Sequence, residues 1–465
     1  MVEIELKFQI SEARRTALLK ALDPKKSETI QLQAKYFDTP DRLLAQHGAA
    51  LRQRLEGISW IQTLKAAGKS HLHRFEHNHN LGELESSPEL DLSIYQAIPE
   101  AQQILTQALG SDAAALKLTF ETDIQRTYRV IQFEDAEIEV CLDVGVVRAS
   151  GREQTIHEVE FELKSGSVQS LLAFSFEWVK KYQLWLDVRS KAEMGNLLAL
   201  EQTVSPARFE KEFVLSKKES AAHNLSLLIG QQMQHLLPNI AAISAGVAEQ
   251  SHIDQAQTAL EHLQLTLALF KDWNSNISDK WAMQLAAFKH QFDHLQHLQH
   301  MQSTLGAFLQ NPTTTENLAK DILYAQEKLG NLVKSTQNVH HYLELLTFSL
   351  SSHDQVQKQD LKTYAHNTLQ NQYRQLQESL NAADISHFES LDVLAQKIKE
   401  LKFSFPILTS IYDVKNLQKY SKALNDAQQA AHEYQILATS AAYIQQTELE
   451  ASDWFVLGWL TAKLE

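Results

Sequence analysis

Several short segments among the first 200 residues alternate strictly between charged and apolar side chains. In residues 2–8, Glu3, Glu5 and Lys7 alternate with four apolar residues. Side chains two residues apart in a β-strand lie on the same face. A strand formed here would therefore have one face that is entirely charged and another that must be buried against an apolar layer.

The same alternation recurs in other segments with strand-like composition. Residues 50–55, 60–65, 73–78, 136–144 and 157–166 are all predicted strands. A sheet with one solvated face would give this alternation in any single strand. The polar positions are mostly Glu, Asp, Arg and Lys, however, with few of the Thr, Ser and Gln residues that are common on solvated faces. This composition favours an antiparallel barrel whose charged side chains line a central channel.

Charged side chains gathered in a channel predict a charged ligand. Each ion removed from water loses several kcal/mol of hydration unless it is paired or binds a metal. Carboxylates without cysteine or histidine partners favour Mg²⁺ or Mn²⁺ over Zn²⁺. Arg and Lys beside them can bind phosphate oxygens. Acidic and basic residues in one channel therefore indicate a site for a metal and a polyphosphate.

The chain of 465 residues changes character after about residue 205. Leu, Ala, Gln and His then recur at helical spacing, which predicts helices throughout. We expect an α+β multidomain fold: a barrel domain in residues 1–200, a linker in residues 201–217, and an all-α bundle in residues 218–465. Pro238, Pro312 and Pro406 are predicted to mark helix ends in the second half.

Composition narrows the functional class. The net charge of −14 argues against a broad basic surface for nucleic acid. No apolar run is long enough to predict a membrane span. The first residues lack the pattern of a secretory signal, and Cys141 is the one cysteine, so we expect a cytoplasmic protein. The oligomeric state is not predicted.

The first 200 residues resemble the CYTH superfamily, the triphosphate tunnel metalloenzymes. The run Glu3-Ile4-Glu5-Leu6-Lys7 is similar to the motif that opens these domains. The order of the later segments adds to the resemblance. They are Tyr36-Phe37-Asp38-Thr39-Pro40, Leu51-Arg52-Gln53-Arg54, Lys65, Arg74-Phe75-Glu76, Arg126, Glu139 with Asp143, Glu158-Val159-Glu160-Phe161-Glu162 with Ser165-Gly166, and Ser190-Lys191.

This resemblance implies an eight-stranded antiparallel tunnel that binds inorganic triphosphate together with Mg²⁺ or Mn²⁺. The residues that it implies as metal ligands are Glu3, Glu5, Asp143, Glu160 and Glu162. Those implied in phosphate binding are Lys7, Arg52, Arg54, Lys65, Arg74, Arg126 and Lys191, with Glu76 organising the basic residues. Catalysis would involve Glu3, Glu5, Lys7, Glu158 and Glu160. The sequence does not identify which carboxylate activates water.

A CYTH domain before a long helical domain resembles the CYTH–CHAD class of bacterial inorganic triphosphatases, whose helical domain contacts polyphosphate. Here the helical half resembles a degenerate CHAD domain. Residues 252–270 carry Gln, Glu and Thr where Arg is expected, and residues 391–408 carry Asp392 and Ala395 where His and Arg are expected. We expect a scaffold or clamp, with polyphosphate as a second candidate ligand.

Two other functions remain open. The same tunnel could hydrolyse a nucleoside, RNA 5′- or thiamine triphosphate, or cyclise ATP. The chain could also be a polyphosphate-binding scaffold without activity. The complete set of charged residues from Glu3 to Lys191 favours the enzyme.

Overall fold

The computed structural model describes residues 2–68, 72–110, 112–306, 311–351, 360–384, 388–412, 418–446 and 449–464. The chain divides into two compact units. Unit 1 consists of Met1–Arg208, Leu237–His252 and Val333–Thr347, and unit 2 consists of Phe209–Leu236, Ile253–Leu332 and Phe348–Glu465. Unit 1 therefore combines the N-terminal region with two helical segments from the second half of the sequence.

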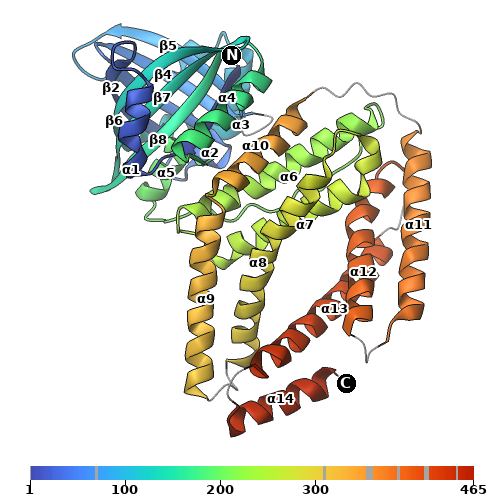
Figure 1. Cartoon of the computed structure of the whole chain (residues 1–465). Helices are drawn as coiled ribbons and strands as arrows, with labels where there is room; N and C mark the ends of the chain where they lie inside the picture. Colours follow the sequence, from blue (N-terminus) through green and yellow to red (C-terminus); the bar gives the residue numbers. More distant parts are fainter. Residues whose placement is uncertain are drawn as a thin grey trace. The chain divides into compact units, whose positions relative to one another are not determined.

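Eight strands of unit 1 form a closed antiparallel barrel (Figure 1). They follow one another in the order β5-β4-β3-β2-β6-β7-β8-β1, and β1 pairs with β5 to complete the ring. The closed barrel expected from the sequence is thus confirmed. The strands are β1 (Val2–Gln9), β2 (Glu28–Asp38), β3 (Ala49–Glu56), β4 (Ser59–Ala67), β5 (His73–Glu83), β6 (Lys117–Phe133), β7 (Ala136–Ala149) and β8 (Arg152–Ser165), with the short β9 (Trp185–Leu186) beside the end of β1.

Apolar packing on the outside of the barrel determines which side chains face inward. Phe8 of β1 lies against Phe161 of β8, with ring centroids 5.2 Å apart. Phe161 in turn packs edge-on against Phe174 of helix α4 (Val168–Tyr182), also at 5.2 Å. Because neighbouring residues of a strand point to opposite faces, this outer layer turns the charged residues of β1 and β8 into the lumen.

A short helix, α5 (Lys191–Ala199), lies across one end of the lumen. Its Met194 belongs to an apolar cluster with Phe120, Val147 and Ile156, which come from β6, β7 and β8. Gly195 lies so close to the Phe120 ring that an added Cβ atom would be 2.1 Å from it. The lumen therefore has an apolar closed end and a charged remainder. The other helices of the N-terminal region are α1 (Glu12–Ala21), α2 (Leu43–Gln46), η1 (Ser93–Tyr95), α3 (Pro99–Leu109) and η2 (Asp112–Ala115).

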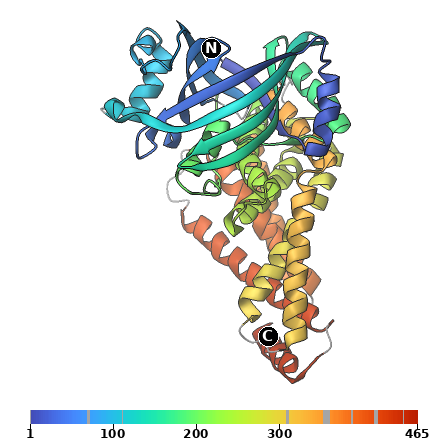
Figure 2. The same ribbon diagram turned by 90° about the vertical axis from the view of Figure 1, so that its left-hand side faces the viewer.

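The second half of the chain is helical where it is described, as expected (Figures 1 and 2). Neighbouring helices contact one another in the pairs α8–α9, α11–α12, α12–α13 and α13–α14. The elements are α6 (Ala221–Ser244), α7 (Gln250–Leu269), η3 (Lys271–Trp273), α8 (Asp279–Leu305), α9 (Pro312–Leu332), α10 (Thr336–Leu350), α11 (Leu361–Ala382), α12 (Phe388–Thr409), α13 (Gln418–Ile444) and α14 (Ala451–Leu464).

Two predicted helix ends were wrong. Pro312 begins α9 as expected, but Pro238 lies inside α6 and Pro406 lies inside α12. Proline removes one helical hydrogen bond and disfavours the interior of a helix. In α6 the flanking Leu237 and Ile240 are buried, so tertiary packing stabilises the helix across the proline.

Residues 201–217, all of which the structure describes, form neither helix nor strand. Among the described residues, no helix has the length and apolar character needed to cross a membrane.

Candidate active site

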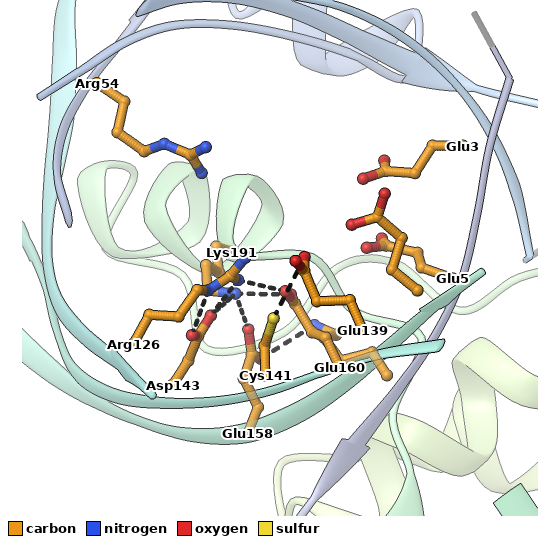
Figure 3. A network of polar contacts seen from close by, with 12 residues as sticks. Glu3, Glu5, Arg54, Arg126, Glu139, Cys141, Asp143, Glu158, Glu160 and Lys191 are labelled. Carbon is orange, nitrogen blue, oxygen red and sulfur yellow. Dashed lines mark hydrogen bonds and ion pairs between the residues drawn. The ribbon is translucent and has the colours of Figure 1, made fainter. Parts of the chain in front are cut away.

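Acidic and basic side chains together line the lumen, and we group some of them by strand as a carboxylate wall and a basic wall. The carboxylate wall consists of residues from the adjacent strands β1 and β8, where Glu5 is in register with Glu162 and Lys7 with Glu160. The basic wall comes from β3, β4 and β6. Figure 3 shows the guanidinium group of Arg54 pointing into the lumen from the side opposite Glu3 and Glu5. The carboxylate wall is Glu3, Glu5, Glu158, Glu160 and Glu162, and the basic wall is Arg52, Arg54, Lys65 and Arg126.

The deepest charged group, which we call the floor cluster, consists of Arg126, Asp143, Glu158, Glu160 and Lys191 (Figure 3). Lys191 is the first residue of α5, and its Nζ atom lies 2.8 Å from Asp143 Oδ2 and 2.7 Å from Glu160 Oε1. It also contacts Glu158. Arg126 donates from Nε to Asp143 Oδ1 at 2.7 Å and from a terminal nitrogen to Glu160 at 2.5 Å. Two cations thus hold three buried carboxylates together.

A second group, the side cluster, consists of Glu3, Glu5, Lys65, Arg74 and Glu76. Lys65 Nζ lies 2.7 Å from Glu3 Oε2 and 2.8 Å from Glu76 Oε2. Arg74 contacts Glu5 Oε1 at 2.7 Å. The side cluster therefore brings carboxylates from β1 together with basic residues from β4 and β5, next to the seam where β1 and β5 close the barrel.

The two clusters hold protons differently. Burial raises the pKa of Glu3 to about 8, against the attraction of Lys65 and with added repulsion from Glu5 and Glu76. Burial also favours the neutral form of Asp143, but Arg126 and Lys191 outweigh it and lower the pKa of Asp143. Lys191 and Arg126 likewise lower the pKa of Glu160 against the effect of burial. Asp143 and Glu160 of the floor cluster are therefore stabilised in their charged forms, whereas burial favours the neutral form of Glu3.

Every residue predicted for the site belongs to the barrel or to α5. The floor and side clusters bring most of them together. Arg52 lies beside the side cluster, 3.9 Å from Glu76, and also lies 3.4 Å from the Tyr36 hydroxyl. Lys7 is nearly buried and lies 3.3 Å from Glu158.

Arg54 and Glu162 lie outside both clusters. They belong to the mouth, which we define by Arg54, Glu56, Glu139, Glu162 and Lys164. Glu162 contacts Lys164 at 2.9 Å, and Arg54 contacts Glu56.

Sequence reasoning did not assign a role to several residues of the lumen. Tyr36 stacks on Phe120 at 4.4 Å and accepts a hydrogen bond from Arg52. Glu56 accepts a hydrogen bond from the guanidinium group of Arg54. Asp187 forms an ion pair with Arg189 at 2.7 Å, and the charge of Lys7 helps to lower the pKa of Asp187. Glu56 could have been found from its spacing of two residues from Arg54. No comparable pattern marks Tyr36, because its neighbours on the lumen face of β2 are apolar.

The donor set fits a hard divalent cation. The candidate ligands are carboxylate oxygens, which Mg²⁺ and Mn²⁺ prefer. Asp143, Glu158 and Glu160 place one oxygen each within 4.8 Å of one another, although Lys191 already contacts all three. Glu3 and Glu5 add two further carboxylates, which Lys65 and Arg74 hold in the side cluster. The carboxylates of Glu3, Glu5, Asp143, Glu158 and Glu160 are thus the candidate metal ligands of the lumen.

Comparison with known proteins gives two family matches. Residues 1–196 match the CYTH domain and residues 227–445 match the CHAD domain. An inorganic triphosphatase of Haemophilus influenzae is 33% identical over 227 residues, which cover 47% of this chain and 62% of that protein. The matched part of this chain therefore spans less than two thirds of that relative's length.

Solved structures with similarity to this chain include a CHAD domain from the plant Ricinus communis. It is 15% identical, with a TM-score of 0.47, over 56% of this chain and 91% of that one. A putative adenylyl cyclase from Hippeastrum, described as having a dominant triphosphatase activity, is 17% identical with a TM-score of 0.32, over 43% of this chain and 97% of that one. Similarity at this level gives no information about function.

Proposed function

The chain carries a CYTH domain followed by a CHAD domain, and we propose that its tunnel hydrolyses inorganic triphosphate to pyrophosphate and phosphate with the help of Mg²⁺ or Mn²⁺. The observation that carries this proposal is the gathering of many carboxylates and basic residues, several of them in direct contact, in a single lumen. The name of the Haemophilus influenzae relative supports inorganic triphosphate as the substrate.

Ligand binding would exchange the partners of the charged residues. In the structure, Lys65 and Arg126 are neutralised by carboxylates of the tunnel itself. A triphosphate would take over these basic side chains, and its accompanying cation would take over the carboxylates. No charge would then be left buried without a partner, which limits the desolvation cost of binding.

Hydrolysis of a triphosphate requires that the phosphates and the attacking water be oriented and that the negative charge on the phosphate oxygens be neutralised. Arg and Lys side chains would fix the phosphates and stabilise the charge on the equatorial oxygens during transfer to water. Bound Mg²⁺ or Mn²⁺ would supply further neutralisation and lower the pKa of a coordinated water. A carboxylate of the wall, among Glu3, Glu5, Glu158 and Glu160, would orient the attacking water or accept its proton.

We propose that the helical region contributes little to polyphosphate binding. Lys399 of α12 is paired with Glu261 at 2.5 Å, and His262 of α7 contacts Glu210 at 2.8 Å. Each of these basic groups has an acidic partner within the second unit, and residues 252–270 contain no Arg or Lys that a polyanion could recruit. The region acts as a scaffold in this proposal.

A substrate panel tests the proposed activity. The purified chain is given triphosphate, ATP, pyrophosphate and long polyphosphate, each with Mg²⁺, Mn²⁺ or EDTA, and the released phosphate is measured. We expect triphosphate with a divalent metal to give the highest kcat/KM and EDTA to abolish turnover. Faster release from ATP than from triphosphate, or full activity in EDTA, would refute the proposal.

Replacing Arg52 with Ala is expected to raise KM for triphosphate and to lower kcat/KM at least about tenfold, because a charge-assisted hydrogen bond of roughly 1.5–3 kcal/mol is lost. The same change at Arg54 should act in the same direction. Steady-state kinetics of both variants provide the measurement. Arg148→Ala is the matched control, since Arg148 forms comparable ion pairs with Asp123 and Glu153 but is half exposed. Kinetics of Arg52→Ala equal to those of the control would place Arg52 outside the phosphate site.

A further inference from the structure

Arg54 of the basic wall is paired with a carboxylate of its own strand. Arg54 Nε donates a hydrogen bond of 2.6 Å to Glu56 Oε1, and a terminal nitrogen of Arg54 also contacts that oxygen. Residues two apart in β3 share a face, so both side chains belong to the lumen side of the strand. A phosphate that binds Arg54 must therefore displace Glu56.

Glu56 lies where the tunnel meets the surface. It is the last residue of β3, and the turn that follows contains Gly57, with φ at +63°, and Ile58, which is 66% exposed. Along the lumen face of β3, side-chain exposure increases from 11% for Arg52 to 17% for Arg54 and 25% for Glu56. A phosphate chain that extends from the floor cluster towards the mouth would pass Arg54 before it reaches Glu56.

The opposite side of the mouth is also acidic. Glu139 of β7 is directly in register with Glu162 of β8, and like charges in this position are unfavourable. Lys164 lies near both, 2.9 Å from Glu162 and 3.8 Å from Glu139. Among the described residues that define the mouth, three carboxylates thus face two cations, one of which is Arg54 itself.

We propose that Glu56 determines specificity for chain length, by admitting three linked phosphates and disfavouring a fourth. The inference rests on the proposed function. With a triphosphate bound, Arg54 exchanges Glu56 for the outermost phosphate, and Glu56 turns outward to water. A fourth phosphate would extend past Arg54 and meet the charge of Glu56 at the acidic mouth, where like charges suppress binding.

The test compares kcat/KM for triphosphate and linear tetraphosphate in the wild-type chain and in Glu56→Gln, with Mg²⁺ present. The ratio of the tetraphosphate to the triphosphate value should rise at least about fivefold in Glu56→Gln. The change should come from a lower KM for tetraphosphate, since Glu56 takes no part in the chemical step. Glu56→Ala removes the same charge and should show the same shift, whereas Glu56→Asp keeps the charge and should retain the wild-type ratio.

Glu153→Gln is the control, because it removes a carboxylate from another Arg–Glu pair, that of Arg148, away from the mouth. If triphosphate were still hydrolysed but the ratio of kcat/KM for tetraphosphate to that for triphosphate were unchanged in both Glu56→Gln and Glu56→Ala, the inference about Glu56 would be wrong while the proposed function would stand. A wild-type chain that releases no phosphate from triphosphate would instead refute the proposed function.

Discussion

Replacing Glu160 with Gln should reduce kcat for triphosphate on the order of a hundredfold or more, since carboxylates that act on a metal or on the attacking water commonly contribute factors of this size. The amide keeps the volume of the side chain but removes its charge. Glu160 lies on the carboxylate wall and contacts both Lys191 and Arg126. Loss of its charge therefore affects the wall that we propose to bind metal and the two cations that would hold phosphate.

Glu5→Gln should show a similar loss, because Glu5 belongs to the same wall through the β1–β8 pairing. Circular dichroism should show both variants folded, and phosphate release gives kcat. Glu153→Gln serves again as the control, with activity close to that of the wild type. If Glu5→Gln and Glu160→Gln both kept kcat within about twofold of wild type, neither carboxylate could act in the reaction.

Lys191→Met should destabilise the barrel by about 3–5 kcal/mol, because breaking a buried ion pair leaves charge without compensation. The carboxylates of Asp143 and Glu158 are fully buried, and Lys191 contacts both as well as Glu160. Scanning calorimetry of the full chain in EDTA measures the effect. The unfolding transition of the barrel is analysed on its own if it is resolved from that of the helices.

A second substitution distinguishes loss of charge balance from loss of packing. Asp143→Asn in the Lys191→Met background removes one of the uncompensated charges and should restore part of the stability. Lys164→Met is the control, since Lys164 is 41% exposed and its pair with Glu162 is expected to contribute at most about 1 kcal/mol. A barrel transition in Lys191→Met no lower than that of the control would show that Lys191 does not hold the floor cluster together.

The sequence predicted those strands of the barrel in which charged residues face the lumen. In β1, and in the parts of β3, β7 and β8 that carry Arg52, Arg54, Glu139, Asp143, Glu158 and Glu160, inward charged residues alternate with mostly apolar outward residues, so the alternation was readable. The lumen face of β2 carries Leu32, Ala34 and Tyr36, which pack against the closed end beside Met194. The polar residues of β2 point outward, so the pattern of charged residues facing the lumen does not hold in this strand.

Some features of the candidate site could likewise be predicted from the sequence, whereas others required the structure. The strands β1 and β8 determine which carboxylates share a wall, and this is encoded in the local spacing of Glu3, Glu5, Glu158 and Glu160. Helix α5 could not be predicted in the same way, because its position depends on distant contacts such as that of Gly195 with Phe120. Lys191 was predicted from the resemblance, but the pairing of Lys191 with Asp143, Glu158 and Glu160 requires the folded chain. The pairing of Arg54 with Glu56 likewise concerns side-chain conformation and became apparent only in the structure.

The most direct test of the proposed metal and phosphate sites is to locate Mn²⁺ by anomalous X-ray diffraction in crystals of Glu160→Gln soaked with Mn²⁺ and triphosphate, in which slow turnover should preserve the ligand. We expect an anomalous peak about 2.0–2.2 Å from carboxylate oxygens of Glu3 and Glu5, with phosphate density between it and Arg52, Lys65 and Arg126. A Mn²⁺ peak remote from the β1–β8 wall, or triphosphate density outside the lumen, would contradict the account.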